Sequence, residues 1–494
     1  MTTSRLPRLL AAVAFASGIS AWIRFLHSDL VLSHYDAKAH LVVARRVIDN
    51  ITPGWQQIGA VWLPLPHLLQ ILPTQIDLFY RTGAAGSLLS IASFVVAVWA
   101  GAQLATAMTG SPLAAATVAA ILMVNPNLLY LQSTPMTEPL LLATVFLVVL
   151  WLYEWISLPA TAGSGKLHAP GKLGWALFLA AWTRYEAWLV IAAALIVTAY
   201  VLVRRGSGIR TVTITARLAA WPAAAVGLFL VNSRISTGRW FVTGGFYEVD
   251  PTYHGLIVKS AIAVWWGTHR LSGYVVESVA LMTAAWLVVQ AFRPATSARL
   301  VPVALLAAAV LPFYGFVEGH PFRVRYMVTL AAASAIFCGV AVGLMRRRSV
   351  AISLAVILVV AALVEAPPWQ DDAPMILEAQ WDVPRTIERR AVTDCLQHQY
   401  GGEKILASMG SLAHYMQELS RAGFAIADFI HEGNGELWDF ALKTGPAPHA
   451  GWMIIEEQSE GGDILARRVR EDADFSRGMV RTCEGGGVAL YRRQ

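Results

Sequence analysis

Charged residues are scarce in this sequence. Of its 494 residues, 14% are Asp, Glu, Lys or Arg, whereas a typical soluble domain has about 25%. Hydrophobic residues make up 56% of the chain and form long runs rather than amphipathic stripes. This composition excludes an ordinary soluble protein and predicts a polytopic α-helical membrane protein.

Cysteine is also rare. Three cysteines are too few for a cysteine-held metal cluster or a dense disulfide framework. Cys338 lies within an apolar run, where an inert packing role is expected. Cys395 and Cys483 lie near the C-terminus and would form a disulfide if that region faces an oxidising compartment. The sequence gives no distance between them, so two unpaired thiols are the alternative.

Several catalytic motifs are missing as well. The sequence has no Gly-x-Ser-x-Gly motif, no Cys paired with His and no His-Glu-x-x-His metal site. Met409-Gly410-Ser411 follows an expected strand but lacks the full glycine pattern of a nucleotide loop. Neither a covalent nucleophile nor a set of metal ligands is therefore predicted.

The apolar runs predict about eleven transmembrane helices. The first run follows Arg5 and Arg8 and could be a cleaved signal peptide. We favour an uncleaved span, because the run is long enough to cross a bilayer. The expected spans are residues 9–26, 81–107, 112–131, 138–156, 172–184, 187–203, 213–232, 274–292, 299–317, 326–345 and 349–366.

The basic residues between the spans predict the orientation. With a cytoplasmic N-terminus, the compact basic clusters fall in the inner loops, as the positive-inside rule requires. These clusters explain the net charge of +6 without a nucleic-acid partner. We expect a bacterial inner-membrane protein with its other loops in the periplasm. The inner clusters are Lys166 with Lys172, Arg204-Arg205 with Arg210, Arg293 with Arg299, and Arg346-Arg347-Arg348.

Residues 367–494 differ from the rest of the chain. Pro367-Pro368 marks the boundary, and beyond it the charge density is that of a soluble domain. Short apolar runs alternate with helical patterns, which is typical of a small α/β domain with a partly parallel sheet. We therefore predict a transmembrane domain, 1–366, and an extracytoplasmic α/β domain, 367–494. The expected strands are 405–408, 425–428 and 452–455, and the expected helices are 384–399, 411–422 and 461–470.

The unusual polar residues all fall on the outer side of this topology. Charged groups at membrane depth are costly and usually face a cavity or each other. Groups from several outer loops would therefore line one cavity that opens outward. They are His34, Asp36, Lys38 and His40 in the first loop, Glu138, Arg184 and Glu186 at two later turns, and His320, Arg323, Arg325 and Tyr326 at a fourth.

Each of these residues also has a purely structural explanation. Asp36 could cap a helix start. Glu138, which precedes Pro139, could favour the dipole of a helix N-terminus. The remaining charged residues could contact lipid headgroups or form structural ion pairs, which applies to Lys38, His40, Arg184, Glu186, Arg323 and Arg325.

One carboxylate beside several cations suits a particular reaction. Asp36 would accept a proton from an attacking hydroxyl. The cations would bind a phosphate and stabilise its charge as it leaves. Such a site would transfer a sugar from a polyprenyl-phosphate carrier.

The same residues resemble motifs of a known class. Over residues 1–366 the chain resembles the GT-C integral membrane glycosyltransferases, especially the protein O-mannosyltransferase and aminoarabinose transferase relatives. Those enzymes have an essential Asp in the first outer loop, where His34-Tyr35-Asp36 stands here. Thr183-Arg184-Tyr185-Glu186 is similar to their Thr-Arg-Pro-Glu turn, and residues 320–326 resemble a late His-Lys-Glu-x-Arg-Phe motif. Many relatives have Asp-Glu in the first loop, whereas Ala37 follows Asp36 here.

The resemblance implies a GT-C-like fold and an inverting glycosyltransferase that moves a hexose or pentose. Its partners would be a polyprenyl-phosphate sugar donor, a glycan, lipid or protein acceptor, and the bilayer. No cofactor is assigned, and a divalent cation stays open. The expected roles are general base for Asp36, donor-phosphate binding for Lys38, His40, Arg184, His320, Arg323, Arg325 and Tyr326, and substrate orientation for His34, Glu138 and Glu186.

Two other functions are compatible with the sequence. A flippase or transporter of lipid-linked sugars would use the same polar cavity, but it would need gates on both sides, and the inner loops hold only basic orientation signals. A membrane-anchored structural or sensing protein would instead work through residues 367–494.

Overall fold

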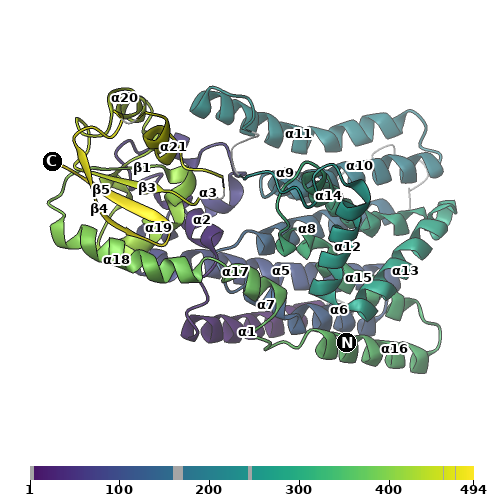
Figure 1. The fold of residues 1–494 in the computed structure, drawn as a ribbon. Helices are drawn as coiled ribbons and strands as arrows, with labels where there is room; N and C mark the ends of the chain where they lie inside the picture. The colour runs from purple at the N-terminus through teal and green to yellow at the C-terminus, as the bar shows by residue number, and fades with distance from the viewer. Residues whose placement is uncertain (1–4, 159–170, 243–246, 460, 473) are drawn as a thin grey trace.

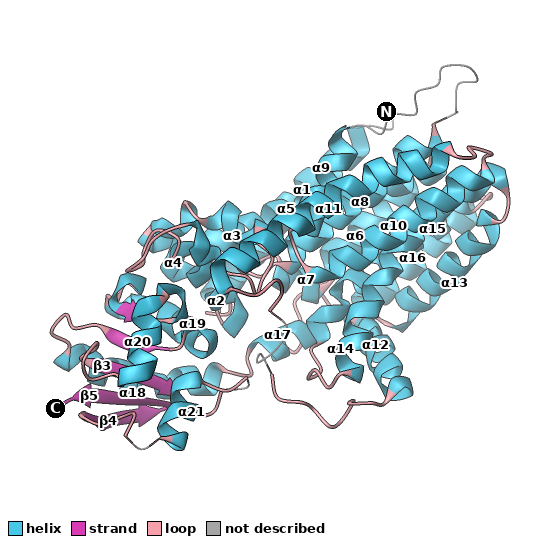
Figure 2. Ribbon diagram, turned by 90° about the horizontal axis from the view of Figure 1, so that it is seen from above, coloured by secondary structure: helices cyan, strands magenta, loops and turns pink. Residues whose placement is uncertain are grey.

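A long helical bundle carries a small sheet-containing part at one end (Figure 1). This arrangement comes from a computed structural model that describes residues 5–158, 171–242, 247–459, 461–472 and 474–494. The expected inner-loop residue Lys166 lies outside the described residues. Seen from above, the strands lie at one end of the molecule and the long helices extend away from them (Figure 2).

Nine helices in the described part of the chain are long and apolar enough to cross a membrane. Two shorter apolar helices, α6 (Pro112–Val124) and α9 (Gly171–Ala181), account for the other two of the eleven expected spans. The polytopic helical fold is therefore confirmed. The nine are α1 (Arg5–His27), α5 (Ala84–Thr109), α8 (Glu138–Ser157), α10 (Tyr185–Arg204), α11 (Arg210–Thr237), α13 (Tyr274–Ala291), the segment Pro294–Val317 ending in α14 (Val310–Val317), the segment Val324–Leu344 containing α15 (Val328–Leu344), and α16 (Arg348–Glu365).

The expected span 112–131 is broken into α6 and a short helix, α7 (Pro126–Leu131). Asn125 ends α6 and caps α7, because its Oδ1 atom accepts hydrogen bonds from the backbone N–H groups of Asn127 and Leu128 at 3.0 and 3.1 Å. Pro126 has no N–H with which to continue α6. The expected outer loop 233–273 also contains a helix that was not predicted, α12 (Ile257–Ser272).

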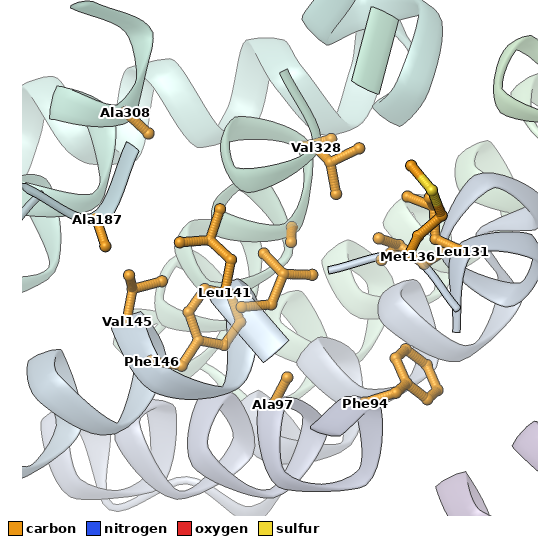
Figure 3. Packing of buried hydrophobic residues seen from close by; sticks show 14 of the residues in the cluster. Phe94, Ala97, Leu131, Met136, Leu141, Val145, Phe146, Ala187, Ala308 and Val328 are labelled. Carbon is orange, nitrogen blue, oxygen red and sulfur yellow. The ribbon is translucent and has the colours of Figure 1, made fainter. Parts of the chain in front are cut away.

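The bundle core lies where α5, α6, α8 and α15 pack together. Figure 3 shows side chains of this core, among them Phe94 of α5, Phe146 of α8 and Val328 of α15. Gly339 lets α15 approach α6 closely, because a Cβ atom there would lie 2.7 Å from the Ala114 carbonyl oxygen. Small residues at such contacts are typical of helices packed in membranes.

The first outer loop is folded rather than open. It forms three short helices, α2 (Tyr35–Arg45), α3 (Leu65–Gln70) and α4 (Asp77–Thr82). In Figure 1 α2 and α3 lie between the bundle and the sheet, and α2 packs against α19 (Met409–Leu419). The loop therefore joins the two parts of the molecule.

The C-terminal part contains a five-stranded sheet with the order β2-β1-β3-β5-β4. β1 is parallel to β2 and β3, whereas β5 is antiparallel to β3 and β4. The partly parallel α/β arrangement is therefore confirmed. The elements are β1 (Ile405–Ala407), β2 (Phe429–Ile430), β3 (Trp452–Glu456), β4 (Met479–Gly485), β5 (Val488–Arg493), α17 (Pro374–Ala379), α18 (Val383–Gln399), α19, α20 (Glu436–Thr444) and α21 (Ile464–Glu471).

The expected strand 425–428 is wrong. Residues Ile426–Asp428 form a 3₁₀ turn, and the strand follows it as β2. Carboxylates impose the turn: Asp428 accepts the Ala425 N–H at 2.8 Å, and Asp49 of the first loop accepts the Ala427 N–H at 3.0 Å. Side-chain acceptors of this kind compete with strand pairing.

Cys395 of α18 and Cys483 of β4 form a disulfide that spans 88 residues of sequence. The disulfide links α18 to β4, the edge strand of the sheet. The hairpin of β4 and β5 was not predicted. Cys338 is buried in α15.

Candidate active site

The candidate site begins at the first turn of α2. His34 caps this helix, and its Nδ1 atom accepts a hydrogen bond from the Asp36 backbone N–H at 3.1 Å. Asp36 lies in the first turn, where the helix dipole favours a negative charge, and both side chains are buried. The cap is therefore His34 rather than Asp36, and the Asp36 carboxylate pairs with a group from elsewhere in the chain.

That group is Arg325, in the 3₁₀ turn Val324–Met327 just before α15. Its Nη1 atom lies 2.6 Å from Asp36 Oδ2 and 2.8 Å from His34 Nε2. The guanidinium is buried. The segment that carries Arg325 is 291 residues from His34 in sequence, and the two segments meet in one buried ion pair.

Burial and this ion pair determine the charge of both groups on α2. Burial opposes ionisation of Asp36, but the Arg325 charge outweighs it, so the pKa of the carboxyl lies below its ordinary value. Burial, reinforced by Arg325, holds the pKa of His34 well below its usual range. At neutral pH the site therefore offers an ionised Asp36, which Arg325 makes a weaker proton acceptor.

A second carboxylate, Glu378 of α17, was missed by the sequence analysis. Its Oε1 atom lies 3.9 Å from Arg325 Nε and 4.0 Å from His34 Nε2. Its other oxygen accepts the Val324 backbone N–H. Residues 374–379 lie near the start of the predicted C-terminal domain, where no helix was expected; Pro374, at the start of α17, is a local signal for this helix.

Arg184 forms a second charged group beside the first. It precedes α10 and donates to Glu186 Oε1 at 2.8 Å and to Thr137 Oγ1 at 2.8 Å. Its Nη1 atom also lies 3.1 Å from Glu138 Oε1. Glu138 is buried at the start of α8, yet neither of its carboxylate oxygens accepts a hydrogen bond from the described residues.

Lys38, expected at the donor phosphate, pairs with the C-terminal part. Its Nζ atom donates to Glu418 Oε1 at 2.6 Å and to Thr386 Oγ1 at 3.4 Å. The side chain is buried. Phosphate binding would require Lys38 to leave this ion pair.

His40 is neutral and packed. Its Nδ1 atom lies 3.0 Å from His67 Nε2, and its ring centroid lies 4.2 Å from that of Trp62. Burial, reinforced by His67, holds the pKa of His40 well below its usual range. Any contact with a phosphate would therefore come from a neutral imidazole rather than a cation.

The remaining expected residues lie close to Arg325 in the sequence. The Tyr326 ring centroid lies 5.4 Å from the Arg325 guanidinium carbon, and its hydroxyl lies 3.3 Å from His320 Nε2. The His320 ring packs on Tyr247 with a centroid distance of 4.3 Å. Arg323 directly precedes the 3₁₀ turn and donates to the Phe322 carbonyl at 3.2 Å.

The arrangement suits anionic and hydroxyl-bearing ligands. Arg184 directly precedes α10 and Arg325 lies in the turn before α15, so both are cations near helix starts, and Glu138 offers acceptor oxygens that hydroxyl groups could use. Within the described residues, no group of three His, Cys, Asp or Glu side chains is placed to hold a metal ion. The predicted site residues are thus divided between the charged groups around Arg325 and Arg184 and the junction with the C-terminal part.

Comparison with known proteins supports the fold. No protein-family model and no curated protein sequence matches the chain. Two solved structures of similar fold are ArnT from Cupriavidus metallidurans in the apo state, with a TM-score of 0.63, and ArnT from the same organism bound to undecaprenyl phosphate, with a TM-score of 0.57. Each is 12% identical, and each alignment covers 99% of this chain and 98% of that chain. The expected GT-C-like fold is confirmed, and the likeness extends through the C-terminal part.

Proposed function

We propose that this GT-C-like fold is an inverting glycosyltransferase that moves a sugar from a polyprenyl-phosphate donor to an acceptor hydroxyl. The observation that carries the proposal is the buried Asp36–Arg325 pair, 2.6 Å apart, with Arg184 and Glu138 beside it. A ligand with both a phosphate and hydroxyl groups complements these charges. ArnT, whose fold the chain shares, has been solved with undecaprenyl phosphate, which supports a lipid-phosphate donor.

The reaction would be one displacement at the anomeric carbon of the sugar. The acceptor oxygen attacks that carbon while Asp36 takes the hydroxyl proton. The bond from the anomeric carbon to the phosphate oxygen breaks on the opposite face, which inverts the configuration. Arg325 and Arg184 stabilise the polyprenyl phosphate as it leaves with the bonding electron pair. Arg323, His320 and Tyr326 would border this phosphate.

Glu138 and Glu186 would orient the donor. Glu186 fixes the Arg184 guanidinium through two nitrogens, at 3.1 Å from Nε and 2.8 Å from Nη2. The oxygens of Glu138 would accept hydrogen bonds from sugar hydroxyls. Holding donor and acceptor together in this way is worth about 7 kcal/mol or more of the barrier.

The positions of the basic clusters support an extracytoplasmic site. α10 begins beside Arg184 and ends at Arg204, and α16 begins at Arg348 and ends at Glu365, shortly before α17 brings Glu378 to the site. The basic ends of both helices are therefore remote from the site. If these ends face the cytoplasm, the site and the C-terminal part face outward.

A transfer assay tests the proposal. Purified protein would be incubated with radiolabelled polyprenyl-phosphate sugars and a membrane extract as acceptor, beside Asp36→Asn and Arg184→Ala. Label that moves to a new product in the wild type, and not in Asp36→Asn, supports the transferase, and analysis of the product identifies the sugar and acceptor. Full transfer by Asp36→Asn contradicts its role as base. Donor that crosses the membrane without forming a new bond would indicate a transporter.

A further inference from the structure

Arg325 faces two carboxylates, one from each part of the molecule. Asp36 of α2 binds its Nη1 atom at 2.6 Å. Glu378 of α17 faces its Nε atom at 3.9 Å, just beyond hydrogen-bond distance. Arg325 Nε and Glu378 Oε1 are both buried without a hydrogen-bond partner among the described residues. A buried donor and a buried acceptor thus face each other without forming a hydrogen bond, which costs free energy in this state. A state in which they do form the hydrogen bond would remove this cost.

The position of Glu378 is fixed by contacts on both sides. Its Oε2 atom accepts the Val324 N–H, in the same turn that carries Arg325. The helix that carries Glu378 is held to the bundle by a hydrogen bond from the Met375 N–H to Asn127 Oδ1, at 3.0 Å. The carboxylate is therefore held near Arg325, and a small side-chain rotation would join Oε1 to Nε.

The proposed reaction requires such a partner. When Asp36 takes the proton of the acceptor it becomes neutral, and Arg325 loses its counter-ion in a buried site. An uncompensated buried charge is strongly unfavourable. A carboxylate that takes over the guanidinium removes this cost and lets Asp36 act as a stronger base.

We propose that Glu378 is a positioning residue that takes over Arg325 as Asp36 leaves the ion pair. This inference rests on the proposed function. In the transfer step the proton moves from the acceptor oxygen to Asp36, while Arg325 keeps its protons and Glu378 stays ionised. Glu378 thereby supplies, from the C-terminal side of the chain, the second acid that is missing at Ala37.

The charges around the two carboxylates predict the direction of the effect. Burial raises the pKa of Glu378 above its ordinary value, and the charges of Arg325, Arg323 and Glu138 act on it. His34 Nε2 also lies 4.0 Å from its Oε1 atom. Arg325, His34 and Arg184 surround Asp36. Without the negative charge of Glu378, Arg325 stays on Asp36 and lowers its pKa further. The acid limb of the pH profile then moves to lower pH.

The kinetic test compares Glu378→Gln with Glu378→Asp and with Glu388→Gln. Glu388 is an exposed residue of α18 and provides a matched control. We expect Glu378→Gln to lower kcat about tenfold or more, with little change in the donor KM, and to shift the acid limb down by about half a pH unit or more. Glu378→Asp should restore the position of the limb, and Glu388→Gln should match the wild type. A lower kcat with an unmoved limb would show a merely structural role and overturn the inference.

A second measurement does not depend on turnover. Infrared titration of the carboxyl bands, with Asp36→Asn to identify the Asp36 band, reads the protonation of Asp36 directly. We expect this band to titrate at lower pH in Glu378→Gln than in the wild type and Glu378→Asp. An unmoved band overturns the inference. A moved band in a protein that transfers no sugar from any donor would contradict the proposed function and leave the sharing of Arg325 standing.

Discussion

Two charge clusters include residues two apart on α2, Asp36 and Lys38, and differ in how completely their charged groups are paired. The site cluster consists of His34, Asp36, Arg325 and Glu378. The junction cluster consists of Lys38, Asp382, Arg389 and Glu418. All three guanidinium nitrogens of Arg389 donate to carboxylates. Nη2 lies 2.7 Å from Asp382 and 3.0 Å from Glu418. Nη1 lies 3.3 Å from Asp382, and Nε lies 3.2 Å from Glu418. In the site cluster Arg325 Nε and Glu378 Oε1 have no such partner within the described residues.

The difference separates structure from function. In a fully paired buried network the low local dielectric strengthens every hydrogen bond, and the network stabilises one arrangement of the side chains. In a partly paired network the unsatisfied groups cost free energy until a ligand or a rearrangement supplies their partners. The junction cluster therefore holds α2 against α18 and α19. The site cluster keeps bonding capacity for a substrate. Four predictions test this contrast.

The largest expected effect is on activity. Asp36→Asn should lower sugar transfer about 10³-fold, within the range of about 10²- to 10⁴-fold that a general base contributes. The melting temperature should also fall, because the neutral amide leaves the buried Arg325 guanidinium without its closest counter-ion, so transfer is compared per folded molecule. Transfer assays and thermal melting in detergent measure the two effects. Asp29→Asn is the matched control, since Asp29 is exposed in the same loop and Asn tolerates its positive φ of 54°. Equal losses in both variants would contradict the assignment.

The junction cluster should respond in stability rather than chemistry. Arg389→Met leaves the buried Asp382 carboxylate without its guanidinium partner and leaves Glu418 with Lys38 as its cation, and should destabilise the C-terminal part by about 3–5 kcal/mol. Pulse proteolysis in urea reports this stability, and transfer per folded molecule should change little. Arg390→Met, at the exposed neighbouring position, should behave as the wild type. If Arg389→Met abolished transfer in fully folded protein, the contrast between the clusters would be wrong.

Donor affinity should depend on Arg184. Arg184→Gln removes a fixed cation and should raise the donor KM about 10- to 100-fold, which corresponds to about 1.4–2.7 kcal/mol. The control is Arg210→Gln, an exposed position at the start of α11. Titration of labelled donor against both variants measures the effect. An unchanged KM in Arg184→Gln would place the phosphate elsewhere.

The smallest expected effect is a pH dependence of stability. Burial opposes ionisation of Glu418, but Lys38 and Arg389 outweigh it and lower its pKa from 4.5 to about 2. The stabilisation is therefore complete above pH 4.5 and is lost as the pH falls toward 2. At pH 4 the loss relative to pH 7 should be about 1 kcal/mol. Urea unfolding of the wild type and Glu418→Gln at both pH values measures it, and the variant should lack this step. A step of equal size in both would assign it to other groups.

The contrast also shows what the sequence could not reveal about Lys38. By type and position it belongs with Asp36, because the two residues lie on one turn of α2. In the structure Lys38 binds Glu418, which is 380 residues away in sequence. Glu378 was missed for the same reason: no local pattern shows that α17 folds back on Arg325. Residues 425–428 failed as a strand because the carboxylate of Asp49, from another part of the chain, holds their backbone in a turn.

The sequence by itself determined the number and positions of the apolar helices, the change in character after residue 366 and the local placement of His34 and Asp36. These depend on runs and caps within a few residues, and the length of an apolar run alone decides whether it can cross a bilayer. Only the tertiary structure decided which charges pair. Several buried cations and carboxylates are chemically interchangeable, and helix packing selects the pairs by bringing together segments such as Asp36 and Arg325.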